Sequence, residues 1–369
     1  MPRKSALEKV KRVVVKVGTS IITKNGHISG RRISRLVSDI MDAAGRGYEM
    51  VVVSSGAISA GCGALNRNRS RLTIPEKQAL ASVGQTILIN EYRKHFLKKG
   101  RDVGQILLTE DDVMHRRRFL NARNTFNTLL QMGIVPVVNE NDSVVIKEIK
   151  FGDNDTLSAH VANIVEADLL IILSDVDGLY RTLSDSRPVY EVFRIDDEIR
   201  AWAGGVGSVH GTGGMQTKLR AAEIIMKSGE KMVIANGMKP GAINRILDGE
   251  KLGTFFIGNN LAMKSRKRWI AFSMKSYGRI VIDEGAVDAL SNAKRSLLAS
   301  GIVAVEGKFD LGDAVELVNA RGAAVGKGIV NYTFKELDLI KGKKTGEIKK
   351  ILGSTYYDEV INRDDLIIY

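Results

Sequence analysis

Short apolar stretches alternate with stretches of helical periodicity over the first 260 residues or so. Residues 12–17, 50–53, 103–108, 134–138, 168–173 and 232–235 are rich in Val, Ile and Leu, as buried strands are. Residues 33–45, 75–98, 110–131 and 215–227 repeat apolar side chains at helical spacing. Strands that alternate with helices pair in parallel through right-handed crossovers. The pattern predicts an α/β domain whose ligands bind at the carboxyl ends of the strands.

The rhythm changes near Ser265. Strand-like pieces then follow at 278–282, 303–305, 314–319 and 323–330, and glycines punctuate them. That spacing predicts a small β-barrel. Charge shifts at the same place, because residues 275–369 carry 14 basic and 14 acidic side chains while the whole chain has a net charge of +13. We therefore expect two domains, residues 1–274 and 275–369.

Composition is that of an ordinary globular protein, with 44% hydrophobic and 26% charged residues. No apolar run approaches the roughly 18 residues that a membrane-spanning helix needs. The basic start of the chain leads into only Val13–Val15 before Lys16, which is too short for a signal peptide. Cys62 is the only cysteine, which fits a reducing compartment. We expect a cytoplasmic protein without a membrane segment.

The excess positive charge lies entirely in residues 1–274. Such an excess suits solubility, nucleic acid or a small anionic substrate. The five histidines lack zinc-ligand spacing, so a zinc centre is not expected.

The first candidate for chemistry is VVVKVGTS, residues 13–20. Lys16 interrupts a valine run, and a lysine is rarely buried without a partner. Gly18 allows a close approach of backbone to a phosphate. The alternative is a solvated strand-to-helix turn, and the buried position of Lys16 favours function.

Polar residues also follow two other strands and precede one helix. VVVSSGAISAG places Ser55 after a strand, where a helix cap is an equal alternative. VVNENDSV contributes Asp142, although polar clusters of this kind are commonly solvated turns. FGDND brings Asp153, Asn154 and Asp155 to a helix start, more than one helix cap requires.

Two further segments place polar residues or glycines at the end of a strand or the start of a helix. LSDVDGLY places Ser174 and Asp175 at a strand end, where a turn is the alternative. GTGGMQTK is a glycine-rich loop that runs into a helix, with Lys218 about one turn inside. The chain has neither GxxxxGK[ST] nor GxGxxG, so P-loop ATPases and dinucleotide enzymes lose support.

Taken together, these motifs resemble the glutamate 5-kinases of the amino acid kinase superfamily. The resemblance is carried, in order, by VVVKVGTS, VVVSSGAISAG, RFLNARNT, PVVNENDSV, FGDNDTLSAH, SDVDGLY and GTGGMQTK. It covers residues 12–274 nearly throughout, and residues 275 to about 353 resemble a PUA domain.

The resemblance implies a three-layer αβα sandwich around a mainly parallel sheet, followed by a small PUA-like β-barrel. It implies ATP-dependent phosphorylation of the side-chain carboxylate of L-glutamate to L-glutamyl 5-phosphate, the first step of proline biosynthesis. It further implies Mg as a cofactor, L-proline as a feedback inhibitor and a homo-oligomer, dimer or tetramer.

It also implies roles for individual residues. Lys16 and Lys218 would act at the ATP phosphates, with Asp155 organising both. Ser55, Asp142 and Asn154 would hold glutamate, and Lys150 and Asp153 would flank that site. The implied ATP-binding set is Lys16, Gly18, Ser174, Asp175, Thr212, Gly213, Gly214, Met215, Gln216, Thr217 and Lys218. No metal ligand is implied, because Mg would be held mainly by the ATP phosphates.

Two alternatives remain open. Another member of the superfamily would act on aspartate, acetylglutamate or carbamate, although the FGDND segment argues for glutamate. An RNA-binding protein could use the PUA-like domain and its lysines between 341 and 350. The neutral balance of residues 275–369 argues against a nucleic-acid partner.

Overall fold

The computed structural model describes residues 3–68, 72–144, 154–182, 184–203, 214–258, 276–293, 295–353 and 357–369. The chain forms two compact units, the first made of residues 1–113 and 118–261 and the second of residues 114–117 and 262–369. The predicted boundary after residue 274 lies outside the described residues and stays a prediction. Each unit is described by itself below.

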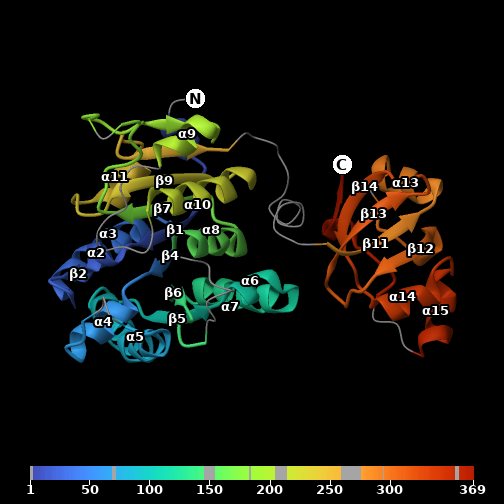
Figure 1. Cartoon of the computed structure of the whole chain (residues 1–369), viewed down its shortest axis with the longest axis horizontal. Coiled ribbons are helices and arrows are strands. Elements are labelled where there is room, and N and C mark those ends of the chain that lie inside the picture. Colours follow the sequence, from blue (N-terminus) through green and yellow to red (C-terminus); the bar gives the residue numbers. More distant parts are fainter. Residues whose placement is uncertain are drawn as a thin grey trace. The chain divides into compact units, whose positions relative to one another are not determined.

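An eight-stranded sheet forms the centre of the first unit (Figure 1). Its strands, in spatial order, are β5 (Val103–Leu108), β6 (Val135–Glu140), β4 (Glu49–Ser54), β1 (Arg12–Val17), β7 (Leu169–Ser174), β9 (Lys231–Asn236), β10 (Thr254–Ile257) and β8 (Glu191–Val192). All neighbours pair in parallel except β9 and β10. The prediction of a mainly parallel sheet is confirmed, and its central strands are buried on both faces, as their valine-rich sequences require.

Helices cover both faces of this sheet (Figure 1). On one side lie α3 (Gly30–Gly45), α5 (Ile74–Leu97) and α11 (Ala242–Leu247), and on the other α8 (Asn154–Val165) and α10 (Met215–Lys227). The remaining elements are α1 (Arg3–Leu7), α2 (Thr19–Ile22), α4 (Ala57–Ala64), α6 (Glu110–Met114), α7 (Arg116–Gln131), α9 (Asp197–Trp202) and the hairpin β2 (Thr23–Lys24) with β3 (His27–Ile28). The αβα sandwich is thereby confirmed. The predicted helix 110–131 is two helices, interrupted at His115.

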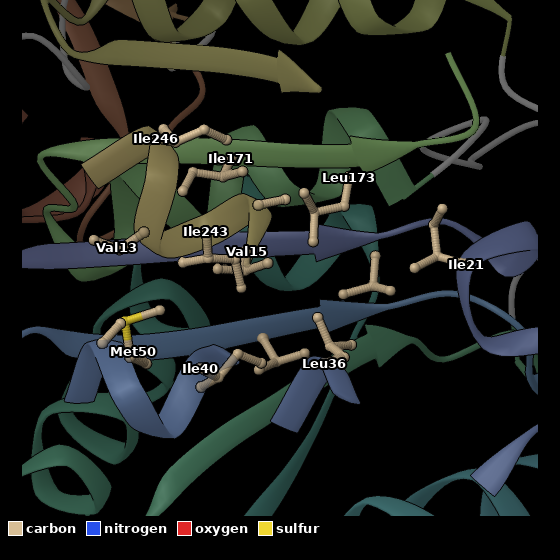
Figure 2. Packing of buried hydrophobic residues seen from close by; sticks show 14 of the residues in the cluster. Val13, Val15, Ile21, Leu36, Ile40, Met50, Ile171, Leu173, Ile243 and Ile246 are labelled. Carbon is tan, nitrogen blue, oxygen red and sulfur yellow. The ribbon is translucent and has the colours of Figure 1, made fainter. Parts of the chain in front are cut away.

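The core of the first unit fixes which way β1 faces. Figure 2 shows Val13 and Val15 packed with Leu36 from α3 and with Ile243 and Ile246 from α11. Successive side chains of a strand point to opposite faces. Lys16 therefore points to the other face, where α8 contacts β1.

The second unit has its own sheet and its own core. Its strands are β12 (Ile302–Gly307), β11 (Ser276–Ile282), β13 (Ala314–Asn319), β14 (Ala324–Ile329) and β15 (Leu366–Ile368), in that spatial order. Within the described part of this unit, three helices accompany them, α13 (Glu284–Ser291), α14 (Phe334–Ile340) and α15 (Thr345–Leu352), with 3-10 turns at Ala299–Gly301 and Arg363–Asp365. The small β-rich C-terminal domain is confirmed, although the sequence patterns did not predict α13, α14 or α15.

Candidate active site

Two lysines share one buried carboxylate on the α8 face of the sheet. Lys16 Nζ lies 2.5 Å from Asp155 Oδ1, and Lys218 Nζ lies 3.1 Å from Asp155 Oδ2. Asp155 has no exposed surface, and the two lysines are 7% and 5% exposed. A charged side chain is rarely buried without a partner. The two ion pairs give each of the three buried charges a partner and thereby link three segments of the chain.

Three separate elements bring these charges to one place. Lys16 lies near the carboxyl end of β1, Asp155 in the first turn of α8 and Lys218 in the first turn of α10. The chain leaves β1 for β4 on one side and later returns to β7 on the other, so the strand order reverses at β1. Open α/β sheets bind ligands at the carboxyl ends of the strands beside such a reversal.

Opposing effects set the ionisation of Asp155. Burial alone would raise the pKa of this carboxyl, but the charges of Lys16 and Lys218 lower it, as do hydrogen bonds from Lys16 and Thr217. The lowering effects prevail and hold the pKa of Asp155 below its ordinary value. With Asp155 ionised, the three charged side chains carry one net positive charge, which favours an anion beside them.

The start of α10 adds a second feature that suits an anion. Gly214 caps this helix in an extended conformation and brings no capping side chain to its N-terminus, where backbone N–H groups can bind an anion. Thr217 Oγ1 lies 2.9 Å from Asp155 Oδ2 and 2.8 Å from the carbonyl oxygen of Gly214, where it can donate to either. Met215 is half-buried and Gln216 exposed beside it, whereas Thr212 and Gly213 lie outside the described residues.

A polar cluster at the ends of β4 and β6 adjoins the charged residues, because Asn154 precedes Asp155 in the sequence. Asn154 Nδ2 lies 3.0 Å from Ser55 Oγ, 3.0 Å from Asn139 Oδ1 and 3.2 Å from the carbonyl oxygen of Ser54. Asp142 is half-buried two residues beyond β6. Lys150 and Asp153 lie outside the described residues.

The carboxyl ends of the neighbouring strands β1 and β7 lie side by side. The backbone N–H of Gly18 donates to the carbonyl of Leu173 at 3.0 Å, and a Cβ at Gly18 would lie 3.3 Å from that oxygen. The Ser174 hydroxyl is buried and donates to Asp175 Oδ1 at 3.1 Å, while Asp175 itself is exposed. The lack of a side chain at Gly18 thus lets the two strand ends approach closely.

Comparison with known proteins agrees with this architecture. Residues 11–236 match the model of the amino acid kinase family, and residues 278–352 match that of the PUA domain. The chain belongs to the amino acid kinase family. Three relatives described as glutamate 5-kinase align along nearly their whole length. The one from Thermoanaerobacter sp. (strain X514) is 49% identical over 97% of both chains, that from Syntrophotalea carbinolica 48% over 99% of both, and that from Moorella thermoacetica 44% over 98% of this chain and 97% of the relative.

Two residues at the polar cluster, Asn139 and Gln85, were assigned no role from the sequence. Asn139 Nδ2 donates to Gln85 Oε1 at 2.8 Å, and Asn139 is almost completely buried. A polar residue at the end of an apolar strand was a usable signal for Asn139. Gln85 gave none, because a polar residue on a long helix is ordinary and its partner lies 54 positions away.

Within the described ranges, no group of three or more His, Cys, Asp or Glu side chains could hold a metal ion. In the same part of the chain, no helix combines the length and apolar character needed to cross a bilayer.

Proposed function

We propose that the chain catalyses ATP-dependent phosphorylation of the side-chain carboxylate of L-glutamate, giving L-glutamyl 5-phosphate. This reaction is the first step of proline biosynthesis. The observation that carries the proposal is the buried group Lys16, Asp155 and Lys218 beside the Ser55–Asn154 cluster. Relatives that bear the name glutamate 5-kinase and align along the whole chain support the same substrate.

The chemistry needs charge stabilisation more than acid–base catalysis. A glutamate carboxylate is ionised at neutral pH, so the nucleophile requires no general base. Phosphoryl transfer depends on positioning and on the neutralisation of charge that develops on the transferred group. Two ammonium groups held by one carboxylate supply positive charge in a site with little water, where it acts most strongly.

We propose the following residue roles, which the geometry of the described residues and the resemblance to glutamate 5-kinases support. Lys16 and Lys218 contact the phosphates and Asp155 positions both lysines. The open start of α10 and the strand ends at Gly18, Ser174 and Asp175 hold the nucleotide. A Mg²⁺ ion accompanying ATP would supply further positive charge at the phosphates, and such ions take only one or two carboxylates from a protein. Ser55, Asp142 and Asn154 hold glutamate, with Lys150 and Asp153 as supporting residues.

Regulation and assembly belong to the same proposal. L-proline is the feedback inhibitor and the active form is a homo-oligomer, and the resemblance to glutamate 5-kinases supports both. Inhibition of turnover by proline and the molar mass by light scattering test these two statements independently.

A substrate panel tests the proposed reaction. ATP turnover is measured with L-glutamate, L-aspartate, N-acetylglutamate and carbamate at equal concentrations, together with trapping of the acyl phosphate by hydroxylamine. We expect turnover and a hydroxamate product with L-glutamate above all. Preference for any other acceptor would assign the chain to a different activity within the family.

A further inference from the structure

A chain of amide groups runs from α5 to the candidate glutamate site. Gln85 Oε1 accepts from Asn139 Nδ2 at 2.8 Å, and Asn139 Oδ1 accepts from Asn154 Nδ2 at 3.0 Å. Gln85 is half-buried on α5 and Asn139 is nearly inaccessible at the end of β6. Each of these three side-chain amides can therefore influence the orientation of the next one.

Two backbone groups fix the direction of these bonds. The N–H of Glu140 donates to Asn139 Oδ1 at 2.9 Å, and the carbonyl of Ser54 lies 3.2 Å from Asn154 Nδ2. A backbone N–H can only donate and a carbonyl can only accept. Neither amide can therefore turn over without losing a backbone partner. The nitrogen of Asn139 must face Gln85, which has to present its oxygen.

One atom of Asn154 is left for a ligand. Its two amide hydrogens are shared among three acceptors, namely the Ser54 carbonyl, Ser55 Oγ and Asn139 Oδ1. Its Oδ1 is buried and has no hydrogen-bond partner among the residues that the structure describes. A buried acceptor without a donor is costly, so a ligand that supplies an N–H gains from meeting it. In glutamate the carboxylates can only accept, and the α-ammonium is the only donor.

We propose that Gln85 is a positioning residue that, through Asn139, holds the Asn154 amide so that its Oδ1 accepts from the α-ammonium of glutamate. This inference rests on the proposed function and adds the group of the substrate that is recognised. Gln85 does not touch the substrate. It supplies the acceptor that keeps Asn139, and hence Asn154, in one orientation.

The first variant removes the side-chain oxygen with which Gln85 accepts a hydrogen bond from Asn139. Gln85→Met keeps the length of the side chain but cannot accept strongly, so we expect KM for glutamate to rise about three- to tenfold with little change in kcat. Gln85→Glu keeps an oxygen facing Asn139 and should restore a KM close to that of the parent. Gln85→Lys can only donate, so it should raise KM at least as much as Gln85→Met. It also serves as the second variant if Gln85→Met does not fold.

Glutarate separates recognition of the ammonium from general damage, because it is glutamate without that group. Its inhibition constant should stay within about twofold of the parent value in Gln85→Met, since no hydrogen bond to an ammonium is lost. Gln131→Met makes the same change at an exposed position on α7 and should alter neither constant. Thermal melting of all variants reports on folding.

Equal weakening of glutamate and glutarate, or an unchanged KM in a folded Gln85→Met protein, would overturn the inference. Either result would leave the kinase activity of the parent standing. A parent chain that transfers no phosphate to glutamate would instead contradict the proposed function. In that case calorimetric binding of glutamate and glutarate to the parent and to Gln85→Met still decides whether Gln85 acts as we infer.

Discussion

At the scale of single residues, Lys218 distinguishes catalysis from binding. It is buried in the first turn of α10 and pairs with Asp155. Lys218→Met keeps most of the apolar stem but removes the charge. We expect kcat to fall by about 10²–10³, with a much smaller change in KM for glutamate, because the charge acts mainly in the transition state. Steady-state kinetics at saturating ATP check this expectation.

The matched control lies on the same helix. Lys227 is exposed in the last turn of α10, so Lys227→Met should leave kcat unchanged. In Lys218→Met, Asp155 keeps its contact with Lys16, so the fold should persist and a melting curve should show it. A folded Lys218→Met protein with the turnover of the parent would remove this lysine from the mechanism.

His160 provides a residue-scale prediction on pH. It is buried on α8, where burial first, and then the charge of Arg220, lower its pKa from 6.5 to about 4. Between those values the unfolded chain binds a proton that the folded protein does not, so stability falls as the pH falls. The loss amounts to at most roughly 3 kcal/mol and is complete near the folded pKa.

Replacement of His160 should flatten this dependence. We expect the free energy of unfolding of His160→Asn to change less between pH 7 and pH 4.5 than that of the parent, as measured by urea titration. His27→Asn, at an exposed position, should retain the slope of the parent. Asp155 is present in both proteins, and because its pKa is lowered in the folded state, its contribution is lost mainly as the pH falls through the ordinary carboxyl pKa of about 3.9 and below. A parent-like slope in His160→Asn would contradict the prediction.

At the scale of elements, regular hydrophobic patterns predicted helices and strands well, whereas contacts between distant segments could not be predicted from the sequence. The valine runs of β1 and β4 and the helical spacing of α5 appear in the structure nearly where the sequence placed them. Lys16 stood out because a charge inside a buried strand demands a partner. The four residues of β10 are too short to show periodicity. The link from Gln85 to Asn139 depends on tertiary packing that no local pattern encodes.

The packing of α4 against α5 gives an element-scale prediction. A Cβ at Gly84 would lie 1.8 Å from the carbonyl oxygen of Ala57, so the two helix backbones are in direct contact. Gly84→Ala should therefore lower the free energy of unfolding by about 1–3 kcal/mol or more. It should also raise KM for glutamate, because α4 begins two residues after Ser55 and α5 carries Gln85.

Gly45 is the control for this change. It is the last residue of α3, and a Cβ there would meet nothing within 4 Å. Gly45→Ala should leave stability unchanged or raise it by up to about 1 kcal/mol, as is usual for this substitution in helices. Urea unfolding of both variants separates the two cases. Equal stability of Gly84→Ala and Gly45→Ala would show that the helices can separate without cost.

At the scale of the whole molecule, the shift in charge and in glycine rhythm anticipated two domains. The structure has one buried cluster built from residues 7–257 and another built from residues 280–368. Likewise, the match to the amino acid kinase family ends at residue 236, and the match to the PUA domain begins at residue 278. The sequence predicts the boundary after residue 274, which lies outside the described residues and therefore stays a prediction.

The separate cores lead to the last prediction. All described residues of the candidate site belong to the first unit, so a fragment of residues 1–274 should keep kcat within about twofold of the full chain if each domain folds on its own core. Since a truncated chain can fail during folding, a specific protease site inserted after Met274 provides the decisive version. Turnover is measured on the intact protein, then again after complete cleavage and removal of residues 275–369. Retained turnover would support a kinase domain that is active by itself. Comparing its proline inhibition and molar mass with those of the intact protein would then show what the second unit contributes. Loss of turnover from a cleaved first unit that keeps its circular dichroism and melting temperature would show that the second unit is required for catalysis.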